Sequence, residues 1–253
     1  MDERKKMGRK NEKNLKMASF KKEPILQLQD VTKSFGNLTA VNDCSFEVER
    51  NLIVGLIGPN GAGKTTLFNL IAGSHTADEG EIIFKDQAIT NLRPYQIAEK
   101  GIGKTFQITR VFSKMTLMEN LIVAARVRNR DDRALELLEL TGLIDLKGDY
   151  ASDLSYGQQK LLALIRVLMF DPDLILLDEP AAGVNPTMQN KIMDLIHKLK
   201  DEGKTFLIIE HDMEVIMEHS DKIVVLNFGE KIAEGTAEEI KGNDEVLKAY
   251  FGR

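Results

Sequence analysis

Residues 52–70 read LIVGLIGPNGAGKTTLFNL, and this stretch decides the fold of the chain. An apolar run leads into Gly58, a glycine-rich turn follows, and residues 64–66 begin a segment of helical character. The spacing Gly58-x4-Gly63-Lys64-Thr65 fits the P-loop pattern, in which a buried strand, a turn and a helix hold nucleotide phosphates. The stretch therefore predicts a nucleotide-binding α/β protein.

The predicted turn has the chemistry that phosphate binding requires. Its glycines allow positive φ angles, so that successive backbone N–H groups point into one concavity at the start of a helix. The side chain of Lys64 would reach the β- and γ-phosphates, and the hydroxyl of Thr65 would bind Mg²⁺. A turn without a ligand is the alternative, and the complete lysine–threonine end of the motif weighs against it. The predicted nucleotide contacts are Gly58, Pro59, Asn60, Gly61, Ala62, Gly63, Lys64, Thr65 and Thr66.

The composition is that of an ordinary globular protein. The chain has 253 residues, 43% hydrophobic and 29% charged, which suits one large or two small domains. Its net charge of −5 argues against nucleic acid as the main partner. The single cysteine, Cys44, excludes an internal disulfide and is expected to be a small buried hydrophobe. No apolar stretch approaches the roughly 18 residues of a membrane span, so membrane association is expected to require a partner.

Residues 1–23 are polar and mostly basic. We expect a disordered leader, or a start that truly lies at Met17. A weak electrostatic attachment to anionic lipid is the alternative function for this segment. No apolar core follows the basic start, so a secretory signal is not expected. The folded domain is predicted to cover residues 24–253.

Strand-like and helix-like segments alternate along the rest of the chain. Alternating polar and apolar residues predict an antiparallel β region, and continuous apolar runs predict strands buried on both faces of a sheet. The antiparallel region covers 25–29, 45–48 and 81–87, the buried strands are 52–57, 174–177 and 205–209, and a late hairpin lies at 222–233. Helices are expected in 111–140 and over 161–170 and 188–200. This alternation predicts a parallel α/β core.

Polar side chains follow the predicted buried strands, where open α/β sheets place their ligands. Asp178 and Glu179 end one strand, so that one carboxylate would hold Mg²⁺ and the other would polarise water. A solvated turn before Pro180 is the alternative. His211 follows the next strand and could hydrogen-bond a γ-phosphate or an attacking water. Gln107, after another short apolar piece, could orient water or meet Mg²⁺.

The segment Ser155-Tyr156-Gly157-Gln158 precedes a predicted helix. A serine and a glycine at this place predict a second anion-binding helix N-terminus, distinct from the P-loop. One chain with two such termini suggests a head-to-tail dimer, in which each P-loop faces the partner's serine–glycine turn across an isologous interface.

In this order and spacing the motifs resemble the ATP-binding subunit of an ABC transporter. The resemblance rests on the P-loop, Gln107, the signature segment 154–158, the strand 174–178 with Glu179, and His211, and it covers residues 25–253. It implies an α/β P-loop NTPase core at about 25–100 and 165–235 with an antiparallel β subdomain. A helical subdomain at about 101–165 would be inserted in that core and would dock on a permease.

The resemblance also implies roles for the matching residues, with ATP and Mg²⁺ as cofactors. Phe35 would stack on adenine, and Ala40 would pack beside it. The catalytic residues would be Glu179 as general base, His211 as γ-phosphate sensor and Gln107. The Mg²⁺ ligands would be Thr65, Gln107 and Asp178. Ser155, Gly157 and Gln158 would reach the ATP held by the opposite subunit.

The implied partners are a second ATPase subunit, identical or related, a pair of membrane permeases and, indirectly, a solute-binding protein. ATP would close the dimer, and hydrolysis would reopen it on the cytoplasmic face of the membrane. Two departures from the family pattern stand out: the signature reads LSYGQ rather than LSGGQ, and Asn185 lies where many members carry aspartate.

Four segments narrow the resemblance to the ATPases of branched-chain amino-acid uptake. They are GIGKTFQ at 101–107, MTLMENL at 115–121, PAAGVNP at 180–186 and AYFG at 249–252. ATPases of urea or amide uptake and of lipopolysaccharide export are the related alternatives. A soluble ABC-type ATPase acting on ribosomes or chromosomes, and a metabolic P-loop kinase, are the alternatives from other classes.

Overall fold

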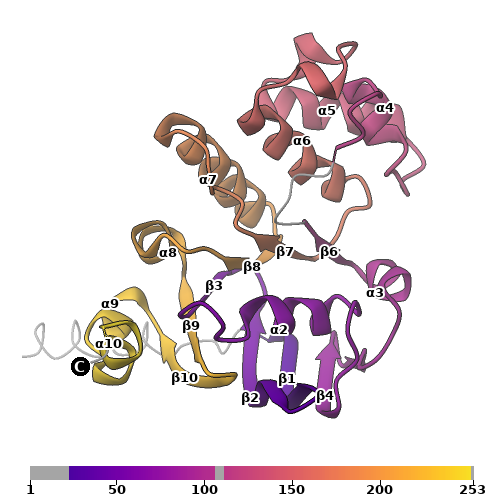
Figure 1. Ribbon diagram of the computed structural model, residues 1–253. Coiled ribbons are helices and arrows are strands. Elements are labelled where there is room, and N and C mark those ends of the chain that lie inside the picture. Colours follow the sequence, from indigo (N-terminus) through magenta and orange to yellow (C-terminus); the bar gives the residue numbers. More distant parts are fainter. Residues whose placement is uncertain (1–22, 106–110, 252–253) are drawn as a thin grey trace, which may run out of the picture.

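The computed structural model describes residues 23–105 and 111–251 (Figure 1). The predicted leader, apart from Glu23, and the predicted site residue Gln107 lie outside this part of the chain.

A six-stranded sheet forms the centre of the fold, in the order β10-β9-β3-β8-β7-β6. The strands are β3 (Ile53–Ile57), β6 (Ile102–Lys104), β7 (Leu174–Asp178), β8 (Thr205–Ile209), β9 (Lys222–Asn227) and β10 (Glu230–Gly235). All neighbouring pairs are parallel except β9 with β10. Every residue of β3, β7 and β8 is buried, as the apolar runs predict. The P-loop strand β3 therefore lies inside the sheet, between β8 and β9.

Both faces of this sheet are covered, and each face belongs to a separate core. Successive residues of a strand point to opposite faces, so Ile53 and Ile57 of β3 join one core cluster and Val54 and Leu56 the other. The first cluster contains the side chains of the long helices, and the second contains those of a smaller sheet.

The smaller sheet is antiparallel, with strand order β2-β1-β4-β5. Its strands are β1 (Pro24–Phe35), β2 (Leu38–Glu49), β4 (Glu79–Phe84) and β5 (Gln87–Ala88). Helix α2 (Lys64–Ile71) contributes Leu67 and Phe68 to the same core cluster as this sheet. Cys44 is buried there, as expected, and burial raises the pKa of its thiol to about 12. The predicted antiparallel region is thus confirmed.

Helices α4 (Leu117–Ile122), α5 (Arg130–Thr141) and α6 (Tyr156–Leu168) form the upper part of the molecule in Figure 1. The helical stretch expected in 111–140 is divided into α4 and α5, and the start of α4 is fixed by a capping box between Thr116 and Glu119. The helix predicted to start at Leu161 begins five residues earlier, because Ser155 and Gln158 form another capping box. Strand β6 pairs with β7 in the central sheet, so the segment expected at about 101–165 begins with a core strand.

The remaining helices lie around the central sheet. They are α3 (Pro94–Lys100), α7 (Pro186–Asp201), α8 (Met213–His219), α9 (Ala237–Lys241) and α10 (Asp244–Phe251). Of these only α7 matches a predicted helix. Asn185 caps α7 by accepting the N–H of Met188 at 2.9 Å, which gives this departure from the family pattern a structural role. Among the described residues, no helix is long and apolar enough to cross a membrane.

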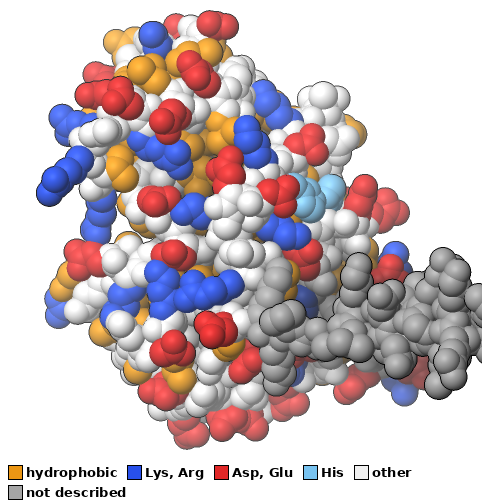
Figure 2. Space-filling view, turned by 180° about the vertical axis from the view of Figure 1, so that it is seen from behind, with side chains coloured by type: hydrophobic (Ala, Val, Ile, Leu, Met, Phe, Trp, Pro, Cys, Tyr) orange, Lys and Arg blue, Asp and Glu red, His pale blue; other side chains and the backbone are white. Residues whose placement is uncertain are grey.

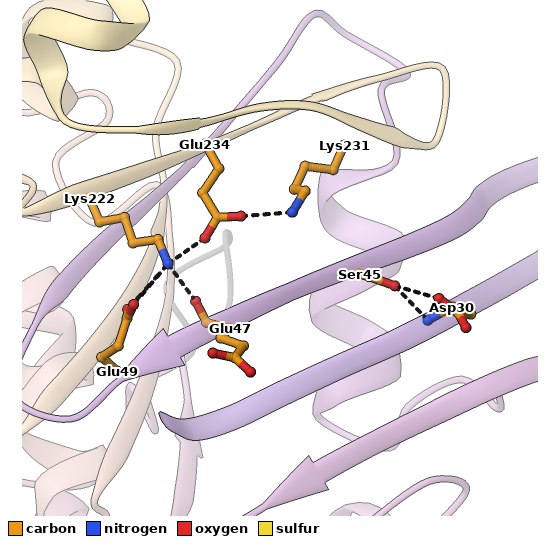
Figure 3. Close-up of polar contacts among 7 residues, drawn as sticks. All are labelled: Asp30, Ser45, Glu47, Glu49, Lys222, Lys231 and Glu234. Atoms are coloured by element: carbon orange, nitrogen blue, oxygen red, sulfur yellow. Dashed lines mark hydrogen bonds and ion pairs between the residues drawn. The ribbon is translucent and has the colours of Figure 1, made fainter. Parts of the chain in front are cut away.

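A polar network ties the late hairpin β9–β10 to β2 (Figure 3). The ammonium of Lys222 lies 3.0 Å from a carboxylate oxygen of Glu49 and 3.2 Å from the carbonyl oxygen of Glu47, and it also pairs with Glu234. Lys231 contacts the other carboxylate oxygen of Glu234 at 2.7 Å. The hairpin β9–β10 is therefore fixed against the antiparallel sheet, next to the P-loop.

Candidate active site

The P-loop connects β3 to α2, and its neighbours approach so closely that two positions must be glycine. A β-carbon on Gly58 would lie 2.2 Å from the carbonyl oxygen of Leu226, and one on Gly63 would lie 2.3 Å from that of Ala40. Both glycines also have positive φ angles, 152° and 98°. The sequence predicted the dihedral requirement, and the structure adds a steric one from β9 and β2.

The N-terminus of α2 has the features of an anion site. Gly63 is its N-cap and supplies no side-chain cap, so no side chain occupies the N–H groups of the first turn. The ammonium of Lys64 lies 2.6 Å from the carbonyl oxygen of Gly58 and 3.0 Å from that of Pro59. Burial lowers the pKa of Lys64, and the nearby Glu179 and Asp178 oppose this shift. The ammonium of Lys64 is therefore already partly desolvated when a phosphate arrives.

A pocket of about 350 Å³ opens over the P-loop. Its lining joins predicted residues from four separate parts of the chain, namely Phe35, Ala40, the loop residues from Asn60 to Thr66, Glu179 and His211. Gly58 and Pro59 contribute to the loop itself and not to this lining. Leu38 also lines the pocket, and it was missed because an exposed leucine in a hairpin gives no sequence signal.

The ring of Phe35, which lines the pocket, is supported by His75 and Lys33. The ring of Phe35 meets the ring of His75 edge to face, with 5.3 Å between the centroids, and the ammonium of Lys33 lies 5.4 Å from the Phe35 centroid. Phe35 remains 45% exposed, so its ring can stack on a planar ligand.

The two acids at the end of β7 are not a solvated turn. Asp178 is buried, and the Glu179 side chain is only 14% exposed. Burial raises the pKa of Asp178, while the ammonium groups of Lys104 and Lys64 act in the opposite direction. A bound cation would stabilise the charged form of this buried carboxylate, as is expected of a metal ligand.

The carboxylate of Glu179 meets the imidazole of His211, with 2.8 Å between Oε1 and Nε2. His211 comes from the end of β8 and is about half exposed at the pocket rim. The φ angle of Glu179 is +53°, and its N–H donates to the carbonyl oxygen of Ile209 at 2.9 Å. The structure thus brings together two side chains that the sequence placed at the ends of successive strands, because β7 and β8 pair in the sheet.

The signature residues Ser155, Gly157 and Gln158 do not line the pocket of their own chain. Ser155 caps α6, since its hydroxyl accepts the N–H of Gln158 at 3.4 Å and the Gln158 side chain accepts the N–H of Ser155 at 2.9 Å. A β-carbon on Gly157 would lie 2.6 Å from the side chain of Met188, so a larger residue here would have to displace this methionine of α7.

The fold and this pocket define a P-loop nucleotide-binding protein. The model of the ABC transporter family matches residues 41–182, and that of the branched-chain amino acid ATP-binding cassette transporter matches residues 230–253. The chain belongs to the ABC transporter family, as one of its ATP-hydrolysing subunits.

Two relatives share nearly the whole chain. The sequence is 39% identical over 251 residues to the high-affinity branched-chain amino acid transport ATP-binding protein LivG of Escherichia coli K12, covering 91% of this chain and 98% of LivG. It is 41% identical over 250 residues to the corresponding protein BraF of Pseudomonas aeruginosa, covering 90% of this chain and 98% of BraF.

Solved structures agree with the fold. An ATP-binding cassette of an ABC transporter in its ADP conformation superposes with a TM-score of 0.85 at 33% identity, covering 91% of this chain and all of that one. A dimeric cassette in a post-hydrolysis state, bound to ADP and Pi, gives a TM-score of 0.75 at 28% identity, covering 84% of this chain and 98% of that one.

Proposed function

We propose that this ATPase powers the uptake of branched-chain amino acids through partner permeases, with Glu179 as its general base. The observation that carries the catalytic part is the Glu179–His211 pair at the rim of the P-loop pocket. A carboxylate can take the proton of an attacking water, and an imidazole beside it can hold that carboxylate and meet the γ-phosphate. Lys64 binds the phosphates, and Phe35 with Ala40 forms the wall for adenine.

Mg²⁺ fits the donors at this site. The hydroxyl of Thr65 and the buried carboxylate of Asp178 are hard oxygen ligands. Among residues 23–105 and 111–251 no group of three or more His, Cys, Asp or Glu residues could hold a metal. This suits a cation that takes most of its ligands from phosphates and water. When bound, Mg²⁺ would neutralise charge on the β- and γ-phosphates. The third proposed ligand, Gln107, lies outside the described residues.

The active unit we propose is a pair of cassettes. The signature turn is exposed and lies outside its own chain's pocket, which is consistent with Ser155, Gly157 and Gln158 completing the nucleotide site of a partner. Isologous pairing would give two such composite sites. The partner would be a second copy or a related ATPase subunit.

A groove beside the helical part is a candidate docking surface for the permeases. Its apolar lining includes Val111, Phe112, Val167 and Phe170. Figure 2 shows hydrophobic side chains exposed among charged ones in the upper part of the molecule, where α4, α5 and α6 lie. Such a surface supports attachment to the cytoplasmic face of a membrane through the permeases, with a solute-binding protein acting indirectly on their other side.

The substrate assignment rests on the segment 230–253 and on the relatives, whose names state branched-chain amino acid transport. It is tested by deleting the gene and measuring the uptake of labelled leucine, isoleucine and valine. Loss of this uptake, restored by the wild-type gene and not by a Glu179→Gln copy, is expected. Normal uptake of these amino acids with loss of urea uptake or of lipopolysaccharide export would reassign the substrate.

The general-base assignment has its own test. Glu179→Gln keeps the size of the side chain and removes the base, so turnover is expected to fall by about 10²–10⁴. ATP-driven dimerisation, measured by size-exclusion chromatography, should survive because the P-loop is unchanged. Lys198→Met serves as a control, because it removes the charge of an exposed side chain on α7 outside the proposed site. Wild-type turnover in Glu179→Gln would remove Glu179 from the chemistry.

A further inference from the structure

Lys160 lies on α6, one and a half turns after its N-terminus, and is buried although it is a lysine. Its ammonium donates to the backbone carbonyl oxygen of Glu179 at 2.6 Å. A buried ammonium is costly unless it is hydrogen-bonded and faces opposite charge. Neither the P-loop chemistry nor the fold of α6 requires a charged residue at this position.

The residue that Lys160 holds has an unfavourable backbone conformation. Glu179 has a φ angle of +53°, and residues with a β-carbon rarely adopt this left-handed region. Such strain persists only where neighbouring groups fix it, and it concentrates at functional sites. Here three hydrogen bonds hold the residue: its N–H donates to the carbonyl oxygen of Ile209 at 2.9 Å, and its own carbonyl oxygen accepts the ammonium of Lys160 at 2.6 Å and, more weakly, the N–H of Ala182 at 3.3 Å. In this conformation the carboxylate of Glu179 lies 2.8 Å from the imidazole of His211.

A second carboxylate supports Lys160. Glu210 is buried, and one of its oxygens accepts the N–H of Ala181 at 2.7 Å, two residues after Glu179. Lys160 and Glu210 attract each other. Burial lowers the pKa of Lys160, which Glu210 opposes, and burial raises the pKa of Glu210, which Lys160 opposes. The turn that follows β7 is therefore held from α6 by Lys160 and from the end of β8 by Glu210.

The ring of Tyr156 lies between the ammonium of Lys160 and solvent. The ammonium of Lys160 lies 5.5 Å from the centroid of the Tyr156 ring, within the range of a cation–π contact. A β-carbon on Gly183 would lie 3.3 Å from the same ring, so the ring packs against the loop that follows Glu179. The bulky residue that replaces a glycine of the signature segment thus lies against Lys160 and beside Gly183 of the loop that follows Glu179.

We propose that Lys160 is a positioning residue that holds the strained backbone of Glu179 and so sets the place of the general base. This inference rests on the proposed role of Glu179.

The test replaces Lys160 by methionine and by arginine in the full-length chain. Lys160→Met keeps the apolar stem and removes the donor, so kcat is expected to fall about 100-fold, the effect of a small misplacement of a catalytic group. The KM for ATP and ATP-driven dimerisation should stay as in the wild type, since the P-loop is not touched. Lys160→Arg restores a donor and most of the lost turnover. Lys198→Met is the matched lysine control.

Two outcomes contradict the inference: an unchanged kcat in Lys160→Met, or a parallel loss of kcat, ATP binding and melting temperature that arginine does not restore. If Lys160→Met fails to fold, the exposed Tyr156 provides a second test. Tyr156→Phe keeps the ring and should keep turnover, whereas Tyr156→Ala admits water to the ammonium and should lower kcat. Equal kcat in these two variants would contradict the inference.

The Glu179→Gln variant separates the two proposals. If it turns over ATP like the wild type, the role of Glu179 fails, and the inference about Lys160 fails with it. If Glu179→Gln is inactive while Lys160→Met is fully active, only the positioning role of Lys160 fails.

Discussion

Two helix N-termini of this protein were both expected to bind phosphate, and the structure builds them in opposite ways. Helix α2 starts at Gly63 with no side-chain cap, in a loop that is enclosed by β2 and β9. Helix α6 starts at Ser155 with a complete capping box, on an exposed turn. The first terminus offers its N–H groups to a ligand, and the second uses its serine and glutamine on its own backbone.

This difference indicates two modes of phosphate binding. The P-loop is preformed, because neighbouring backbone fixes its glycines before any ligand arrives. At the signature turn the Ser155 hydroxyl accepts the N–H of Gln158 at 3.4 Å, a weak bond that leaves its O–H available for the proposed contact with a phosphate. We expect the first site to bind nucleotide within one chain and the second to meet a partner's nucleotide, as proposed above. Three experiments test this contrast.

The largest effect is expected from Gly63→Ala. Its β-carbon would overlap the carbonyl oxygen of Ala40, and its φ angle of 98° is unfavourable for alanine. We expect a loss of about 2–4 kcal/mol of unfolding free energy, measured by urea denaturation, together with loss of ATP binding. Gly61→Ala is the matched control, with a φ angle of 82° and open space around it, and it should cost only about 1–2 kcal/mol. Equal costs would show that close packing does not fix the loop.

A smaller effect is expected from Ser155→Ala. Loss of the cap should lower stability by about 1 kcal/mol, and loss of a hydrogen bond to phosphate should lower turnover by about 10- to 100-fold. Thr236→Ala is the control, because Thr236 forms the same kind of capping box on α9 outside the pocket. It should cost the same stability and leave turnover unchanged. If both variants keep full turnover, Ser155 is a cap and nothing more.

The smallest effect concerns Tyr250 of α10, which is half-buried and whose phenol interacts with the backbone of Gly58 in the P-loop. Burial raises the pKa of Tyr250 from 10.0 to about 12. The folded state therefore favours the protonated phenol, so this group's contribution is complete below pH 10 and is lost as the pH rises through 12. Tyr250→Phe should cost about 1 kcal/mol at pH 7.

At alkaline pH the wild type and the Tyr250→Phe variant can be compared directly. The wild type should lose stability faster than Tyr250→Phe between pH 10 and 12, by up to about 1.4 kcal/mol per pH unit. Urea denaturation of both chains at several pH values measures this difference. Parallel curves for the two chains would mean that the C-terminal helix does not support the P-loop through this hydroxyl.

The sequence predicted those parts of the fold that depend on local pattern. The apolar runs located β3, β7 and β8, since a strand buried on both faces has no polar alternation. The start of α6 was misplaced although its signal, a serine followed three residues later by glutamine, is present in the sequence. Helix α8, with two buried residues in seven, has too short an apolar stripe to be recognised. Strand order was not predicted, because pairing between distant strands leaves no local trace.

The same distinction holds for the site. The P-loop, Asp178, Glu179 and His211 could be proposed from the sequence because each follows a strand at a motif position. Leu38, Lys160 and Glu210 were missed because their places depend on packing between elements far apart in sequence. The left-handed backbone of Glu179 could not be predicted either, since no glycine marks it.

The enclosure of the P-loop also has a consequence for synthesis of the chain. β3 pairs with β8 and β9, which the ribosome makes some 150 residues later, and Gly58 and Gly63 pack against Leu226 and beside Gly229. A nascent chain that ends before these residues carries the whole phosphate-binding motif without the wall that β9 supplies. Nucleotide binding is therefore acquired only when translation is almost complete, and truncated products should not compete for ATP.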